Sequence, residues 1–427
     1  MKHAKPDVII IGGGIGGLCL AQALKQADIP YRVYERDESS GARLQGYRLN
    51  VEPFGAHALH DCLPAPLWDL LVETSGDPGP GMGVFTQGLR QLMYEPSPDL
   101  PDPVDRAHAV SRATLRRLLL AGLDNVTFGQ EFVRYQQDGD AIRVEFADGS
   151  SDRATLVVGA DGAGSRVRRQ FLPDAEIFSP GGFGVGGKLY LTDATRQWLP
   201  EALQRSKNMI MPWSDFLFTA VFHRRTQAAR IPAELRDRLD AIGAKLDDGF
   251  LREAAEADYV MWAFVSKKPL SLPTPDADYR AAIEQRAKGW HPALARLIRE
   301  TDPTTVDLFN FAAARPVRPW ATSGVTLLGD AIHQMPPVGG LGGNVAMCDA
   351  RDLAKAITAS AAAGVDPRAA IGDYEAAMLK RGFAAVREAS RYLMLGTSRS
   401  RPLRMTALGF FGLCGAVPPL RRAVFAD

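Results

Sequence analysis

Short apolar runs that end in glycine occur in distant parts of the chain. The run DVIIIGGG at 7–14 is followed by the helical spacing of LCLAQALKQAD and by a second run, YRVYER. A buried strand, a helix and another strand are the repeating unit of a parallel sheet. The runs TLVVGADG at 155–162 and GVTLLGDA at 324–331 show the same pattern of a buried strand that ends in glycine. We therefore expect one parallel sheet built from distant parts of the chain.

The middle of the chain has a different pattern. VGGKLYLT, DFLFTAVFHRR and YVMWAFVSKK are aromatic-rich strand candidates that show partial alternation. They predict a mainly antiparallel sheet domain over 180–285, inserted into a Rossmann-like α/β domain made of 1–179 and 286–390, with small excursions near 45–105. A long helix is expected from about Asn344, and 391–427 is expected to be a C-terminal helical segment.

Two local signals sharpen this outline. SRATLRRLLLAGL has helical spacing, and Ser111 is a suitable N-cap for it. IRVEFADGS alternates and ends in an Asp-Gly pair, which is typical of a β-hairpin.

Composition narrows the class of protein. The 427 residues are 46% hydrophobic and 23% charged with a net charge of +1, as in an ordinary globular protein without a basic patch for nucleic acid. The four cysteines form no CxxC pair, so we expect neither disulfides nor a metal site, and a cytoplasmic location. No signal peptide is evident, and no run approaches the roughly 20 apolar residues of a membrane span. The apolar stretch 405–420 is expected to pack on the body of the protein, with contact to a membrane surface as the lesser alternative.

The first glycine cluster carries a dinucleotide-binding pattern. Gly12, Gly14 and Gly17 fit GxGxxG between a strand and a helix, and Glu35 ends the second strand. These glycines allow a tight turn, close approach of a pyrophosphate and close helix packing, while the acid can bind a ribose. The pattern alone is weak, because GFGVGG at 182–187 also fits it but precedes a strand. There we expect only a glycine-rich turn or bulge.

Two later segments supply further candidate chemistry. Asp161-Gly162 and Gly329-Asp330 each follow a predicted strand, and a run of prolines and glycines at 336–343 leads from the second pair into a helix. A carboxylate at the carboxyl end of a parallel strand is well placed to bind sugar hydroxyls.

In this order and spacing, the three segments resemble the class A FAD-dependent aromatic hydroxylases, the single-component flavoprotein monooxygenases. The resemblance covers the chain to about residue 390 and is strongest to the smaller members. It implies a non-covalently bound FAD, with the cofactor-binding residues Gly12, Gly14, Ile15, Gly16, Gly17, Glu35, Arg36, Arg43, Asn50, Arg112, Asp161, Gly329, Asp330, Pro337, Gly340, Gly342, Gly343 and Asn344. Leu341 departs from the family pattern, in which Gln or Glu is common at this place.

The resemblance also implies a reaction. In the family, NADPH or NADH reduces FAD, O2 adds to give a flavin C4a-hydroperoxide, and an oxygen atom passes to an electron-rich ring. A helix that starts near Asn344 offers its positive end to the reduced flavin. The sequence leaves open a reductase, an epoxidase or a halogenase-like enzyme, or a non-catalytic flavin-binding protein that stabilises an intermediate.

The substrate is expected to be a small, planar, largely apolar aromatic molecule. Its candidate contacts are Met211, Trp213, Phe216, Phe218, Trp262, Phe264, Pro336 and Gly339. No acid or base stands out, and the weak catalytic candidates are His223, Lys188, Tyr47 and Arg48, whereas His333 is expected to be a packed or capping histidine. A monomer or a homodimer is expected.

Overall fold

A five-stranded parallel sheet forms the first half of the fold. The computed structural model describes residues 5–39, 41, 48–98, 100–224, 231–246, 250–251, 257–270 and 278–425. The strand order is β20-β12-β1-β2-β8, and each adjacent pair is parallel. The bounds are β1 Val8–Ile11, β2 Tyr31–Tyr34, β8 Val126–Thr127, β12 Leu156–Gly159 and β20 Val325–Leu327. Strands from distant parts of the chain therefore lie in one sheet, as the apolar runs predicted.

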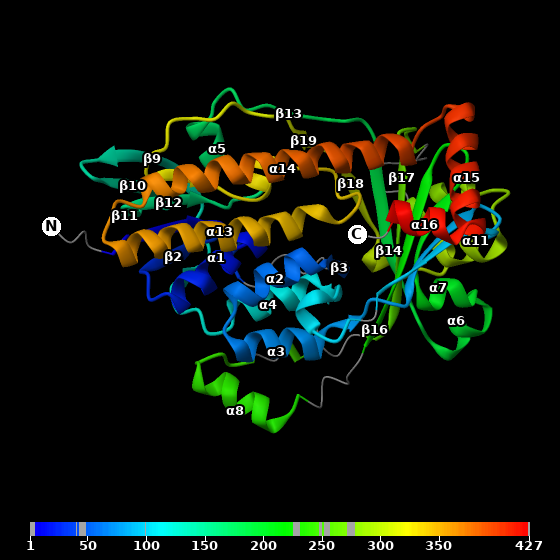
Figure 1. Ribbon diagram of the computed structural model, residues 1–427, viewed down its shortest axis with the longest axis horizontal. Helices are drawn as coiled ribbons and strands as arrows, with labels where there is room; N and C mark the ends of the chain where they lie inside the picture. Colours follow the sequence, from blue (N-terminus) through cyan, green and yellow to red (C-terminus); the bar gives the residue numbers. More distant parts are fainter. Residues whose placement is uncertain are drawn as a thin grey trace.

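Long helices cover this sheet. Their bounds are α1 Ile15–Gln26, α2 Pro53–Cys62, α4 Arg112–Leu120, α13 Leu341–Ala363 and α14 Arg368–Gly396. Helix α13 packs against α1, α2 and α14, and α14 runs back alongside it toward the second half of the fold (Figure 1). Ser111 caps α4 as predicted, since its hydroxyl accepts a hydrogen bond from the Thr114 N–H. Gly364 ends α13 in the left-handed conformation, where glycine carries no steric penalty.

The second half is a larger, mainly antiparallel sheet. Its main path is β18-β14-β17-β16-β15-β5-β6, with β3, β4 and β7 attached beside β16. The predicted span supplies β14 Phe183–Tyr190, β15 Lys207–Met211, β16 Phe216–Arg224 and β17 Tyr259–Ser266. The other strands come from outside it: β3 Arg48–Val51, β4 Gly76–Asp77, β5 Gly81–Thr86, β6 Gln91–Pro96, β7 His108–Ser111 and β18 Asp307–Asn310.

The two faces of this sheet have different neighbours. Leu217 and Val221 of β16 belong to a buried cluster with residues of α10 Tyr279–Arg286 and α11 Pro292–Arg299, beside α6 Asp193–Trp198 and α7 Glu201–Arg205. Phe216 alternates to the opposite face, where it packs with Val338 and Leu393. This second face is therefore the one that meets the parallel-sheet half.

The second GxGxxG match is part of a strand rather than the expected turn or bulge. Gly184 and Gly187 lie inside β14. A Cβ atom at Gly184 would meet the Phe311 ring at 3.0 Å, and one at Gly187 would meet Thr301 at 2.7 Å. These glycines therefore make room for side chains packed on the sheet, and no helix follows them.

Smaller elements complete the described chain. The predicted hairpin forms from β10 Ala141–Phe146 and β11 Ser151–Ala154, and β9 Phe132–Asp138 adds a third strand. The remaining elements are α3 Ala65–Thr74, α5 Arg166–Phe171, α8 Ala233–Ala241, α12 Asp330–His333, β13 Ile177–Phe178, β19 Ala313–Ala314 and the 3-10 turns Pro103–Asp105 and Pro303–Thr305.

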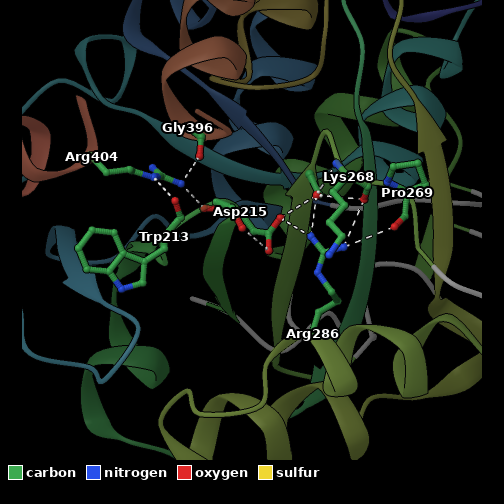
Figure 2. Close-up of polar contacts among 9 residues, drawn as sticks. Trp213, Asp215, Lys268, Pro269, Arg286, Gly396 and Arg404 are labelled. Atoms are coloured by element: carbon green, nitrogen blue, oxygen red, sulfur yellow. Dashed lines mark hydrogen bonds and ion pairs between the residues drawn. The ribbon is translucent and has the colours of Figure 1, made fainter. Parts of the chain in front are cut away.

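Two C-terminal helices, α15 Arg401–Ala416 and α16 Pro418–Phe425, lie at the edge of the second sheet. The buried Arg404 fixes α15, because its guanidinium donates to the backbone oxygens of Asp215 at 2.5 Å and Gly396 at 2.7 Å (Figure 2). The Asp215 carboxylate in turn accepts a hydrogen bond from Arg286 at 2.7 Å. Within the described residues no single helix meets the length and hydropathy of a membrane span; α15 and α16 meet them only as a pair bent by 113°.

Candidate cofactor site and active site

The first glycine cluster forms a tight turn between β1 and α1. Gly12 has a φ of 112°, and a Cβ atom there would lie 2.3 Å from the Ala160 carbonyl oxygen. A Cβ atom at Gly17 would lie 2.2 Å from the Gly12 carbonyl oxygen. Gly14 differs, because nothing lies within 4 Å of its Cβ position and no side chain caps α1. Gly12 and Gly17 therefore serve packing, whereas Gly14 leaves the helix N-terminus open to a ligand.

Glu35 lies beside this turn at the end of β2. Its Oε2 accepts a hydrogen bond from the Gly13 N–H at 2.7 Å, and Arg36 next to it is exposed. Arg116, which sequence reasoning missed, donates to the Gly13 carbonyl at 3.0 Å and has its Nη2 3.9 Å from Glu35. The only sequence signal for Arg116 is its place one turn after Arg112 on α4.

Asp161 lies at the carboxyl end of β12. Its Oδ2 accepts hydrogen bonds from the backbone N–H groups of Arg166 at 2.7 Å and Val167 at 3.3 Å, while Oδ1 is buried without a partner among the described residues. The buried Arg168 donates to the Ala331 carbonyl at 2.8 Å, beside Asp330. This bond, which the sequence did not indicate, ties the two Asp-containing turns together.

Asp330 begins α12 at the end of β20. Its side chain is accessible, although protein surrounds it on most sides, and this burial raises its pKa, while the positive charges of His333 and Arg112 act to lower it. A Cβ atom on Gly342 would lie 3.7 Å from Asp330 Oδ1. The carboxylate therefore lies directly beside the start of α13.

The second glycine segment forms the start of α13. Gly339 and Gly340 have φ values of 87° and 68°, and no side chain caps the helix. The segment is adjacent to the first cluster, since a Cβ atom at Gly16 would lie 3.3 Å from the Ala346 Cβ. The two glycine clusters, more than three hundred residues apart in sequence, thus meet at the α1–α13 contact.

The side chain of Asn344 binds the backbone at Asn50 and Glu52. Its Nδ2 donates to the Asn50 carbonyl at 2.9 Å, and its Oδ1 accepts from the Glu52 N–H at 2.9 Å. This side chain therefore fastens α13 to β3. On β3, Leu49 lies against Gly343, with 3.2 Å from its Cδ1 to the Cβ position.

A buried ion network supports the Gly329–Asp330 turn. His333 Nε2 is 2.5 Å from Asp349 Oδ2, Arg381 donates to the other oxygen of Asp349 at 2.8 Å, and the Gly329 N–H donates to Asp349 at 3.1 Å. His333 is thus packed, as expected. Burial alone would lower its pKa, but Asp349 raises the pKa of His333 above its ordinary value, and His333 and Arg381 hold that of Asp349 below its ordinary value despite burial.

We expect His333 to make stability depend on pH. Its raised pKa gives a stabilising contribution that is complete below the unfolded-state pKa of about 6.5 and is lost as pH rises through the folded-state value. The free energy of unfolding in urea should therefore fall from pH 6 to pH 8, and His333→Gln should flatten this slope. The exposed His57, replaced by Gln, is the control. An unchanged slope in His333→Gln would show that the pair is not ionised as described.

The candidate substrate residues lie on both faces of the second sheet. Phe216 and Phe218 lie on the face toward α13, with Phe216 in contact with Val338 of the proline–glycine segment that also contains Pro336 and Gly339. Met211 is buried with Cys414 of α15, and Trp213 is half exposed in the turn before β16. These last two residues lie toward the C-terminal helices.

Three predicted candidates lie on the opposite face of the sheet from Phe216 and Phe218. Trp262 is fully buried and donates to Thr301 at 2.7 Å, and Phe264 packs in the same cluster, on the face covered by α10 and α11. His223 also alternates to this face, and its nitrogens contact Asp258 at 2.9 Å and the Gln204 carbonyl at 2.6 Å. Aromatic strand patterns in the sequence do not reveal which face of a sheet helices cover. Arg43 and Tyr47 lie outside the described residues.

The residues present fit an elongated dinucleotide. Two uncapped helix N-termini, at α1 and α13, leave backbone N–H groups available for negative charge. Asp161, with its orphaned oxygen, lies beside Gly12 of the first cluster, and the accessible Asp330 lies beside Gly342 of the second, so both carboxylates could accept hydrogen bonds from the hydroxyls of such a ligand. In the described chain no group of three or more His, Cys, Asp or Glu could hold a metal ion.

Comparison with known proteins agrees with this geometry. The family model described as FAD binding domain matches residues 5–247 and 252–389. The chain therefore belongs to this family of FAD-binding domains, which FAD-dependent monooxygenases share. A crystal structure described as an FAD-containing monooxygenase from Photorhabdus luminescens is 30% identical, with a TM-score of 0.77 over 92% of this chain and 99% of the other.

Three curated relatives are named as FAD-dependent monooxygenases or hydroxylases. A dual O-methyltransferase/FAD-dependent monooxygenase of Phaeosphaeria nodorum is 30% identical over 83% of this chain, and one of Cercospora beticola is 31% identical over 88%. This chain spans only 40% and 44% of their respective lengths. An FAD-dependent urate hydroxylase of Klebsiella pneumoniae is 29% identical over 86% of this chain and 84% of its own.

Proposed function

We propose that the protein is an FAD monooxygenase that uses NADPH or NADH and O2 to hydroxylate a small, planar aromatic compound. The observation that carries the proposal is the contact between the α13 start and the apolar sheet face at Phe216 and Val338. It brings the segment suited to the redox end of FAD next to an aromatic wall. The names of the relatives, which are monooxygenases and hydroxylases, support the same reaction class.

Different segments of the chain would hold different parts of FAD. The open N-terminus at Gly14 would hold the pyrophosphate, Glu35 the adenosine ribose, and Asp330 the hydroxyls of the connecting chain. The N–H groups of Gly342 and Gly343 would face the ring system, where the positive end of α13 stabilises negative charge on it. When bound, FAD supplies the transfer of electrons and activation of O2 that no protein side chain can perform.

A hydroxylase must also exclude water from the reacting oxygen species, because water diverts it to hydrogen peroxide. Phe216 and Phe218 are half-buried on the face toward α13, and Leu393 of α14 is 1% exposed beside them. We propose that this apolar layer forms the dry wall of the substrate site.

Turnover with product analysis tests the proposed function. The protein reconstituted with FAD is mixed with aromatic compounds, and the oxidation of NADPH and NADH is followed with and without O2. We expect a substrate to accelerate nucleotide oxidation and to gain one oxygen atom from isotopically labelled O2. Oxidation with no oxygenated product, at equal rates with and without O2, would identify a reductase instead.

We predict that Phe218→Asp uncouples the reaction. A carboxylate on the apolar face admits water, so the hydrogen peroxide released per NADPH should rise severalfold, while FAD content stays unchanged. Phe218→Leu keeps the wall apolar and serves as the matched control. Equal peroxide yields from the wild type and Phe218→Asp would remove β16 from the substrate site.

A further inference from the structure

Strand β3 carries a buried arginine on the side away from the cofactor segment. Leu49 contacts Gly343, so the alternation of a strand turns Arg48 and Asn50 to the other side. In register, Asn50 lies opposite Ala109 of β7, and Ala109 packs with Phe222 and Tyr259 of the second sheet. Arg48 therefore lies between β3 and the aromatic face of that sheet.

The guanidinium of Arg48 has unused donors. The residue is 8% exposed, and its Nη2 makes only long contacts, 3.5 Å to Asn50 Oδ1 and 3.3 Å to the Pro78 carbonyl. Its Nε and Nη1 are buried without a partner among the described residues. Buried guanidinium groups are normally paired, so two vacant N–H donors are an exception that needs an explanation.

The nearby carboxylates do not neutralise Arg48 directly. Glu52 accepts a hydrogen bond from the Asn50 side chain, and Asp77 accepts one from the Gly79 N–H at 2.9 Å. Burial lowers the pKa of Arg48 to about 10, although Tyr259, Glu52 and Asp77 act electrostatically to raise it. The group therefore remains positively charged at neutral pH.

Further cations and aromatic rings surround the same place. Burial lowers the pKa of Lys207 on β15, while Glu52 acts to raise it and the charge of Arg48 acts to lower it. Lys188 on β14 has its Nζ 4.5 Å from the centre of the Tyr259 ring. That ring stacks on Phe222 with centroids 5.2 Å apart and an interplanar angle of 11°. Positive charge and flat aromatic surface thus occur together.

We propose that Arg48 is a substrate-binding residue, and that the substrate is an aromatic compound with an anionic oxygen group, a carboxylate or an acidic phenolate. The vacant Nε and Nη1 donors would bind this oxygen, in the paired geometry that arginine offers to such groups. The ring of the substrate would lie on the aromatic face, with its electron-rich side toward the start of α13. This inference rests on the proposed function and specifies its substrate class.

Binding of matched charged and neutral probes tests the site. The FAD-loaded protein is titrated with salicylate and with salicylamide, and separately with para-nitrophenolate and para-nitroanisole, and the change in flavin absorbance reports binding. We expect the charged member to bind about tenfold more tightly, and Arg48→Gln to remove this preference while leaving neutral binding within about twofold. The salicylate pair tests a carboxylate as the bound anion, and the nitrophenolate pair tests a phenolate. The control variant is Arg143→Gln, which replaces an exposed arginine on β10.

The melting temperature of Arg48→Gln shows whether Arg48 serves substrate binding or instead stabilises the fold. An arginine that lacks partners destabilises the ligand-free protein, so Arg48→Gln should melt at the same temperature as the wild type or higher. Arg48→Lys should keep part of the preference for anions, since it keeps the charge but loses the paired donors. A large fall in melting temperature, equal weakening of charged and neutral probes, or no binding of either anion by the wild type would overturn the proposal. These readings need no turnover, so a failed hydroxylation assay would contradict only the proposed reaction.

Discussion

Asp330→Ala is expected to lose most of its FAD during purification. The carboxylate lies at the end of β20 beside the N-terminus of α13, and its pKa is raised because protein surrounds it. The side chain is exposed, so it is available to accept hydrogen bonds from the cofactor. Charge-assisted hydrogen bonds contribute about 1.5–3 kcal/mol each, which predicts at least about a tenfold weaker affinity for FAD.

The affinity is measured by titrating the apoprotein with FAD and following the quenching of flavin fluorescence. Asp330→Asn keeps the shape and should fall between the wild type and the alanine variant. Asp140→Ala, on the exposed turn between β9 and β10, should bind FAD normally. Unchanged FAD affinity in Asp330→Ala, with a normally folded protein, would show that the carboxylate does not touch the cofactor.

Two substitutions in the first glycine cluster should affect stability and cofactor binding separately. Gly12→Ala forces a Cβ atom to 2.3 Å from the Ala160 carbonyl in a left-handed conformation, which should cost about 2–4 kcal/mol of unfolding free energy. Gly14→Ala meets nothing within 4 Å and has a φ of −80°, so its stability should stay within about 0.5 kcal/mol of the wild type. Its methyl group would nevertheless occupy the space that the pyrophosphate needs, and FAD affinity should fall about tenfold.

Urea unfolding of the apoproteins and FAD titration measure the two effects separately. Gly139→Ala provides a control, because Gly139 has positive φ and open space at its Cβ position and lies in the turn between β9 and β10, away from the cofactor turn. It should lose about 1 kcal/mol of stability through backbone strain and no FAD affinity. Normal FAD binding by Gly14→Ala would refute the assignment of the pyrophosphate to the N-terminus of α1.

Several parts of the fold could be predicted because their signals are local. The buried strands β1, β12 and β20, the Ser111 cap and the β10–β11 hairpin follow from apolar runs, a capping hydroxyl and an Asp-Gly turn. Gly12 was also identified correctly as a tight-turn glycine and Gly17 as a glycine that allows close helix packing. In each case neighbours within a few residues decide the conformation.

Other features depend on partners far away in sequence. Trp262 and Phe218 occur on similar aromatic strands, but α10 and α11 cover only the face that contains Trp262. Asn344 fits the family's cofactor motif, yet its amide binds the backbone of β3 instead. Arg116 and the His333–Asp349–Arg381 network had no recognisable pattern, because their residues come from separate helices.

The sequence by itself determined the parallel strands and the glycine turns, because these follow from backbone sterics and local hydrophobic pattern. That two distant segments serve one cofactor was implied by the family resemblance. Only the tertiary structure decided which sheet face meets α13, which carboxylates remain accessible and which buried cation keeps unpaired donors among the described residues. Burial and charge pairing are properties of the assembled neighbourhood. The unpaired donors of Arg48 therefore became visible only when β3 was placed against the aromatic sheet.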